Sequence, residues 1–254
     1  EEVAQRAGYA LIIAPSHADP GRELGVVQTF QAYRVAGVIS TSSHMTGLQL
    51  AQLQQLPSPL ILVNHEQGGP GTGSVRIDDA DIARSATTHL IDLGHRTIAH
   101  IMCDDRAVSS LARLASYRTC LREHGLEDDP RLVIPTVDSE EGGADAARRL
   151  LALSPRPTAV FCYNDRIAIG VLAGLQRAGV RVPGEVSVVG VDDISVAPWV
   201  TPALTTVRQP SREMGTIAME TTLHLIEGGT APASIVLPGV LIERQSTAPP
   251  GVAG

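Results

Sequence analysis

Short runs of apolar residues, many of them β-branched, recur along the chain. Each run is almost wholly apolar, which is typical of a parallel strand covered by helices on both faces. The pattern predicts strands at residues 9–14, 35–41, 60–64, 98–103, 158–163 and 186–191.

Between these runs, apolar residues recur every three or four positions, as on one face of a helix. Residues 79–93 show this stripe after a capping Asp78 or Asp79. A second stripe covers 165–178 and stops at Gly179, and a third covers 211–227, with Ser211 as its expected cap. These three segments are predicted to be amphipathic helices with polar N-caps.

Strands that alternate with helices predict an α/β fold with doubly wound parallel sheets. The length of 254 residues suits two such lobes. The glycine-rich segment 68–73 is predicted to be a surface loop.

Polar residues follow every predicted strand, which is where ligands bind in such folds. They are Ser16-His17, Thr41-Ser42-Ser43, Asn64-His65, Asp104-Asp105, Asn164-Asp165 and Asp192-Asp193. The pattern indicates either a binding site or the ordinary polarity of strand ends.

Composition narrows the classes of function. All 20 basic residues are Arg, so lysine Schiff-base chemistry and a P-loop lysine are excluded. A net charge of −7, with one Trp, four Tyr and two Phe, does not suit a nucleic-acid surface. No apolar run has membrane-spanning length, no signal peptide is visible, and the three Cys show no paired spacing. We therefore expect a cytoplasmic protein without membrane contact.

Catalytic and metal-binding motifs are not found. GxSxG, HExxH and CxxC patterns are lacking, and His95 is expected to hydrogen-bond a helix-to-strand turn rather than bind zinc. Asp192 directly follows an apolar strand, so its carboxylate can face a cleft. We predict no catalytic residue, metal or cofactor, and an α/β enzyme that uses Asp192 and Asn164 is the less favoured alternative.

Six segments then occur in a recognisable order. They are 93–99 (LGHRTIA), 156–161 (RPTAVF), 164–170 (NDRIAIG), 182–193 (VPGEVSVVGVDD), 202–210 (PALTTVRQP) and 241–247 (LIERQST). Together they resemble the LacI/GalR family of transcriptional regulators over nearly the whole chain.

The resemblance implies a periplasmic-binding-protein-like (type I) effector domain, in which three crossover strands join two lobes. One lobe would be 1–78 plus 208–237, and the other 79–207 plus 238–254, with crossings near 78–79, 207–209 and 237–239. The family's helix-turn-helix, its hinge helix and the first strand of its N-terminal lobe are absent from this sequence.

The resemblance also implies ligand-binding residues. Arg113, Asn164 and Asp192 match positions that the family turns toward the effector. Their guanidinium, amide and carboxylate groups suit a polyol, since they donate to and accept from neighbouring hydroxyls. Positions near other family contacts are Ser109 and Asp138, with Thr41 and His65 in the first lobe.

The function implied is that of an effector-sensing and dimerising domain of a regulator, most often a repressor. The partners would be a sugar or sugar derivative in the interlobe cleft, with a nucleoside as second choice, and a second copy of the chain. Operator DNA would be bound only through the missing N-terminal domain. Trp199 lies near a region that the family uses for dimerisation, or it packs in the core. A solute-binding protein of a sugar transporter is the alternative function.

Overall fold

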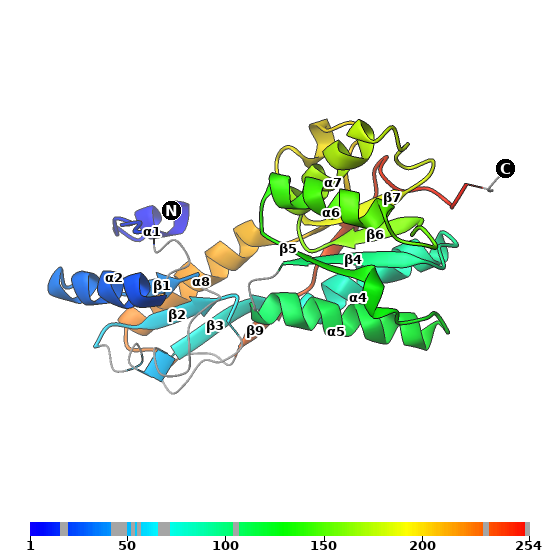
Figure 1. Ribbon diagram of the computed structural model, residues 1–254. Coiled ribbons are helices and arrows are strands. Elements are labelled where there is room, and N and C mark those ends of the chain that lie inside the picture. The colour runs from blue at the N-terminus through cyan, green and yellow to red at the C-terminus, as the bar shows by residue number, and fades with distance from the viewer. Residues whose placement is uncertain are drawn as a thin grey trace. The chain divides into compact units, whose positions relative to one another are not determined.

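The chain folds into two compact units, each built on one sheet. The computed structural model describes residues 1–15, 20–41, 50–51, 54, 57–65, 72–103, 107–230 and 234–251. The first unit comprises Glu1–Ile77 and Pro210–Leu237, and the second comprises Asp78–Gln209 and Pro238–Gly254 (Figure 1). The chain passes from one unit to the other three times, so each unit is made from separate stretches of sequence.

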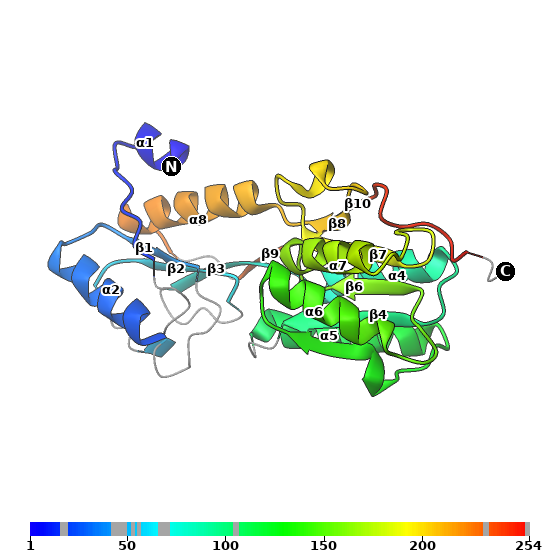
Figure 2. The same ribbon diagram turned by 45° about the horizontal axis from the view of Figure 1, so that its top comes forward.

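The sheet of the first unit has four parallel strands in the order β1-β2-β3-β9. They are β1 (Val38–Ser40), β2 (Leu60–Val63), β3 (Thr72–Ile77) and β9 (Ile235–Leu237). Helices α2 (Pro20–Ala32) and α8 (Ser211–Ile226) lie on opposite sides of strands β1–β3 (Figure 2). Alternate side chains of β2 serve the two faces, because Leu60 and Leu62 pack with Val27, whereas Ile61 packs with Met214. A short helix, α1 (Glu2–Arg6), precedes them.

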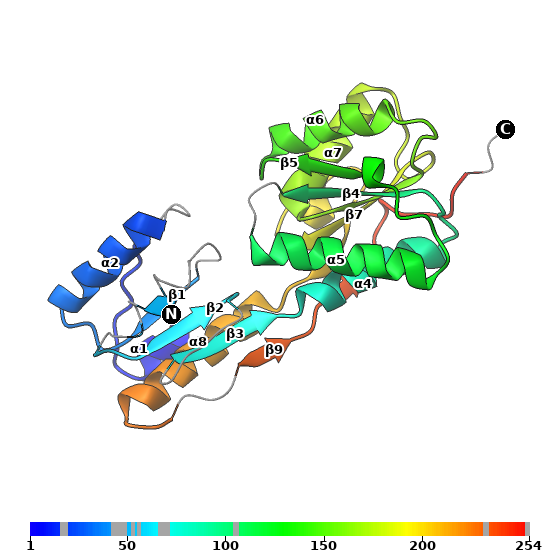
Figure 3. The same cartoon turned by 60° about the horizontal axis from the view of Figure 1, so that its bottom comes forward.

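The sheet of the second unit has six strands in the order β10-β8-β7-β6-β4-β5, and only β10 runs antiparallel. The strands are β4 (Ile98–Cys103), β5 (Val133–Thr136), β6 (Ala159–Cys162), β7 (Ser187–Asp192), β8 (Thr205–Arg208) and β10 (Val240–Ile242). The helices are α4 (Asp79–Asp92), α5 (Val108–Glu123), α6 (Glu140–Leu151) and α7 (Asp165–Arg177). Figure 3 shows α4 and α5 on one side of this sheet and α6 and α7 on the other. This is the predicted doubly wound α/β fold.

Close packing of α6 on α7 fixes the start of α7. A Cβ atom at Gly143 would lie 2.2 Å from the carbonyl oxygen of Ile167, and one at Gly170 would lie 2.1 Å from that of Glu140. Only glycine allows the two backbones to approach so closely. The first turn of α7, which follows Asn164, is therefore held firmly against its neighbour.

The C-terminal segment is tied into the second unit by buried polar residues. His95 forms hydrogen bonds with Thr158 (2.9 Å), Ser187 (3.0 Å) and the carbonyl of Ala248 (3.0 Å), as expected for a hydrogen-bonding rather than a metal-binding histidine. Burial lowers the pKa of His95, so its ring is held neutral. Ser246 accepts from the Thr205 N–H (2.8 Å) and donates to a carbonyl of β7 (2.6 Å).

Several predicted elements are confirmed almost to the residue. The predicted strand at 98–103 coincides with β4, and β2, β6 and β7 lie within one residue of their predicted bounds at each end. The three predicted helices end one residue early, and Asp78 caps α4 by accepting from the Asp81 N–H at 3.0 Å.

Three local predictions were wrong, and one of the two alternatives for Trp199 is excluded. Residues 9–14 form no strand, because a strand needs a hydrogen-bonding neighbour and the described residues supply none. Thr72 and Gly73, expected in a loop, begin the buried strand β3. Ser211 is the first residue of α8 and gives no side-chain cap. Trp199 does not pack in the core, since it is 83% exposed.

Candidate functional site

Polar side chains gather where strands β4 to β7 end, at one edge of the second sheet. Asn164, one of the predicted residues, caps α7 directly after β6. Its Oδ1 accepts from the Ile167 N–H at 2.9 Å, and its Nδ2 donates to Asp138 at 2.8 Å. Asp138 follows β5 and is exposed. The second N–H of the Asn164 amide has no partner among the described residues.

Arg113 is the most strongly anchored of the predicted residues. It lies on α5, it is 3% exposed, and its Nε donates to Asp79 at 2.8 Å. A second nitrogen, Nη2, lies 2.8 Å from the same carboxylate oxygen, and Nη1 donates to the Tyr163 carbonyl at 2.5 Å. These contacts engage three of the five N–H groups of a guanidinium, and the other two have no hydrogen-bond partner among the described residues.

Tyr163 joins Arg113 to Ser109. The Arg113 guanidinium lies over the Tyr163 ring, 4.6 Å from its centroid, and Ser109 forms a hydrogen bond of 2.8 Å with the Tyr163 hydroxyl. A cation held over an aromatic face and bonded to a carboxylate has little freedom to reorient. The strand-end pattern predicted Asn164 but not Tyr163, because an aromatic residue in an apolar run gives no polar signal.

Asp192 ends β7, and one donor among the described residues holds its carboxylate. Gln209 Nε2 donates to Asp192 Oδ1 at 2.5 Å. Burial raises the pKa of Asp192 to about 7, and the nearby positive charge of Arg113 opposes this rise. The negative charges of Asp165 and Asp138 raise it further. Near neutral pH this carboxyl group can therefore either donate or accept a hydrogen bond.

The backbone at Asp192 and Asp193 is unusual. Their φ angles are +116° and +55°, in the region that residues other than glycine seldom adopt. On an extended strand, adjacent side chains point to opposite faces. Here the turn sends Asp192 to Gln209 and Asp193 to Arg208 and Arg244.

The structure brings together five of the seven predicted residues, all in the second unit. Arg113 and Ser109 meet at Tyr163, Asn164 binds Asp138, and the charges of Arg113 and Asp138 act on Asp192. The other two predicted residues belong to the first unit. Thr41 is exposed after β1, and His65 follows β2, where its carbonyl accepts from Ser74 at 2.8 Å.

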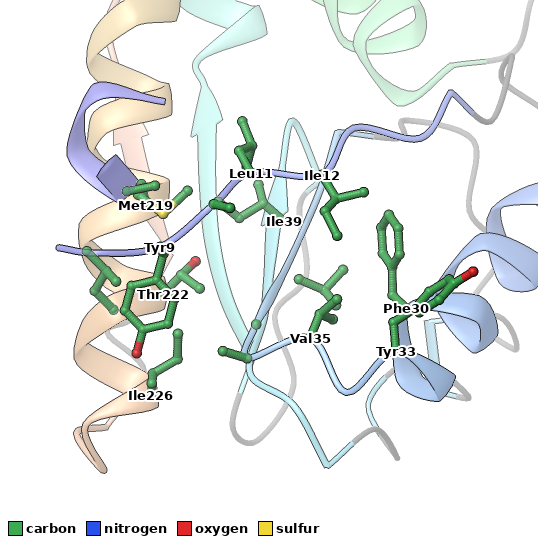
Figure 4. Close-up of a pocket in the computed structure, with 16 residues that line it drawn as sticks. Tyr9, Leu11, Ile12, Phe30, Tyr33, Val35, Ile39, Met219, Thr222 and Ile226 are labelled. Carbon is green, nitrogen blue, oxygen red and sulfur yellow. The ribbon is translucent and has the colours of Figure 1, made fainter. Parts of the chain in front are cut away.

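The first unit also contains a cavity of about 310 Å³. Figure 4 shows it beside the segment that carries Tyr9, Leu11 and Ile12, with Phe30 of α2 and Met219 of α8 in its walls. The lining is mainly apolar and includes neither Thr41 nor His65. This cavity therefore lacks the convergent polar groups that a polyol requires.

No group of three or more His, Cys, Asp or Glu residues among those described could hold a metal ion. No helix in the described part of the chain is both long and apolar enough to cross a bilayer.

The comparisons with known proteins agree with the fold. Residues 87–247 match the family model described as a periplasmic binding protein-like domain. The HTH-type transcriptional regulator GalR of Escherichia coli is 33% identical over 254 residues, which cover 99% of this chain and 74% of that protein. The chain belongs to the LacI/GalR family of transcriptional regulators.

Solved structures of the family resemble this chain closely. Transcription regulator CcpA of Lactococcus lactis superposes with a TM-score of 0.88 at 29% identity, covering 97% of this chain and 90% of that one. A LacI family regulator from Enterococcus faecium, solved with bound ribose, gives a TM-score of 0.87 at 27% identity, covering 98% and 91%. The periplasmic-binding-protein-like fold and the family predicted from sequence are thus confirmed. These relatives are transcriptional regulators, so this LacI/GalR chain is a regulatory domain rather than an enzyme.

Proposed function

We propose that the chain is the effector-sensing and dimerising domain of a LacI/GalR-type repressor, and that its effector is a sugar or sugar derivative. Bound effector would alter the affinity of the whole regulator for operator DNA. The proposal rests chiefly on Arg113, a buried cation whose charge acts on the carboxyl group of Asp192 and which has two N–H groups without a partner among the described residues. The relative solved with bound ribose supports the choice of a sugar.

The chemistry of this group fits a ligand with adjacent hydroxyls. The two N–H groups of Arg113 would donate to ring or hydroxyl oxygens, and the oxygen of Asp192 that Gln209 does not engage would accept from a hydroxyl. The remaining N–H of Asn164 would donate to a third position. Ser109 and Asp138 would complete the polar lining of the second unit, and Thr41 and His65 are proposed to contribute from the first.

The decisive experiment is a thermal-shift panel of D-ribose, D-galactose, D-glucose, their phosphates and the common nucleosides. A ligand at 100 times its Kd adds about 2.7 kcal/mol to the stability of the folded chain, which a melting curve resolves easily. We expect a sugar to raise Tm and the shift to vanish in Asp192→Ala and Arg113→Gln. Arg148→Gln, which alters an exposed ion pair on α6, is the matched control and should keep the shift.

Each outcome has a clear meaning. A shift with nucleosides alone would replace the sugar class with the second candidate. No shift with any compound, in a chain that melts cooperatively, would count against small-molecule sensing by this chain.

We further propose that the regulator acts in the cytoplasm, where operator DNA lies, and as a homodimer. Among the described residues of the second unit, the exposed Trp199 best suits a partner surface, because a large aromatic ring seldom stays fully in water.

A further inference from the structure

The turn that carries Asp192 is held by two sets of contacts that the strand-end pattern did not predict. Two successive residues at positive φ, neither of them glycine, cost on the order of 1–3 kcal/mol each, so the surroundings must impose this conformation. The contacts of Asp165, Asp193 and Arg244 impose it.

One set lies beneath the turn. Asp165 is fully buried at the start of α7. Its Oδ2 accepts from the Ile194 N–H at 2.9 Å, and its Oδ1 accepts from the Thr206 hydroxyl at 2.5 Å. A Cβ atom at Gly190 would lie only 2.2 Å from Asp165 Oδ1, so the strand makes room for this carboxylate. The turn is thereby tied to α7 and β8.

The second set lies on the side of β8 and β10. Asp193 receives Arg244 Nη2 on one oxygen at 2.5 Å and Arg208 Nε on the other at 2.7 Å. Arg244 also donates to the Leu204 carbonyl at 2.7 Å, which fixes the guanidinium itself. The Asp193 side chain is 8% exposed and that of Arg244 is 14% exposed, so solvent screens this pair only weakly.

The electrostatics agree with this arrangement. Burial alone would raise the pKa of Asp193, but the hydrogen bonds from Arg244 and Arg208 more than offset burial, and the pKa lies below its ordinary value. Asp193 is therefore an anion that two cations hold in place. Asp192, its neighbour, keeps one carboxylate oxygen with no protein donor among the described residues.

We infer that Arg244 and Asp193, together with Asp165, are positioning residues of the effector site: they impose the turn that presents the Asp192 carboxyl group. This inference rests on the proposed function in treating Asp192 as a ligand-binding group. Arg244 and Asp193 touch the turn and its supports, and no contact with the effector is assigned to them.

The test uses the sign of a change in the pKa of Asp192. The carboxyl carbon of Asp192 is titrated by NMR in the 254-residue chain, with Asp192→Asn to assign the signal. If Arg244 acts only as a nearby positive charge, Arg244→Gln will raise the titration midpoint of Asp192. If Arg244 holds the turn, its loss will let water reach Asp192, and the midpoint will fall from about 7 by one pH unit or more.

Conservative rescue and controls complete the test. Arg244→Lys keeps one donor for Asp193 and should keep most of the wild-type midpoint. Arg131→Gln breaks an exposed ion pair with Asp129 and should change nothing at Asp192. Should Arg244→Gln fail to fold, Arg208→Gln removes the second donor to Asp193. Because the Arg208 side chain is 53% exposed, we expect a smaller fall in the titration midpoint of Asp192.

A midpoint that stays or rises in folded Arg244→Gln or Arg208→Gln would overturn the inference. The titration needs no effector. A chain that binds no sugar would thus contradict the proposed function without affecting this result, and an unmoved midpoint would contradict the positioning role alone.

Discussion

At the scale of single residues, Asp192 combines a binding role with a cost in stability. Burial raises its pKa from an ordinary 3.8 to about 7, so the folded chain disfavours the ionised form that the unfolded chain accepts. Because the folded state binds this proton more tightly, the contribution of Asp192 to stability falls as pH rises from about 4 to about 7.

Asp192→Asn should therefore stabilise the chain without effector, and more so at alkaline pH. An amide can still accept from Gln209 but carries no charge to bury. We expect a gain of about 1–2 kcal/mol at pH 8 and little gain at pH 5, after allowing for the partial exposure of the group. Urea unfolding at both pH values measures it.

The control for this prediction is Asp145→Asn, at an exposed acid on α6. Its effect should not follow the same pH dependence. An Asp192→Asn variant that is equally or less stable than wild type at pH 8 would show that the buried charge carries no penalty.

Some residues of the candidate site could be predicted from the sequence, and others could not. Asn164 and Asp192 follow apolar strands, so position alone marked them as candidates. Arg113 was recognised only through the family resemblance, since a helical arginine gives no local signal of burial. Asp79, Tyr163 and Arg244 were missed because their roles depend on partners tens of residues away in the chain.

At the scale of elements, β7 and α7 pack closely because residue 190 is a glycine and has no side chain. Asp165 at the start of α7 lies so close to Gly190 of β7 that a methyl group cannot be placed between them. The same carboxylate accepts hydrogen bonds from the turn and from β8, so it cannot move away without losing both.

Gly190→Ala is expected to destabilise the chain by about 1–3 kcal/mol, the usual cost of forcing extra volume into a packed interior. Gly215→Ala is the matched control. It makes the same chemical change at an exposed position of α8, where nothing lies within 4 Å of the added Cβ atom, and should stabilise the chain by about 0.5–1 kcal/mol. Equal effects of the two substitutions in urea unfolding would contradict the close contact at Gly190.

Elements with a strong period were predicted well, and those defined by their neighbours were not. The hydrophobic pattern was sufficient to predict strands β2, β4, β6 and β7 from their apolar runs. It also predicted helices α4, α7 and α8 from their apolar stripes. Helix α5 was not predicted because it buries polar residues such as Ser110, Arg113 and Ser116, so its sequence shows no apolar stripe. Residues 9–14 show the opposite error, since they have the composition of a strand but no described strand to pair with.

At the scale of the whole molecule, the proposed dimer can be tested at Trp199. If its ring is central to the interface, Trp199→Ser should weaken association by 2 kcal/mol or more, about 30-fold in the dissociation constant. Light scattering over a dilution series measures this. Tyr33→Ser removes an aromatic ring that is 74% exposed in the first unit, and it should leave association unchanged. A wild-type chain that is monomeric at micromolar concentration would rule out the dimer.

The three passages of the chain between units have a genetic consequence. The second unit needs both Asp78–Gln209 and the C-terminal stretch, which supplies β10, Arg244 and Ser246. No single uninterrupted piece of the gene encodes it. A recombination event that replaced the whole second unit would also carry α8 and β9 of the first unit, so the two units are expected to be inherited together.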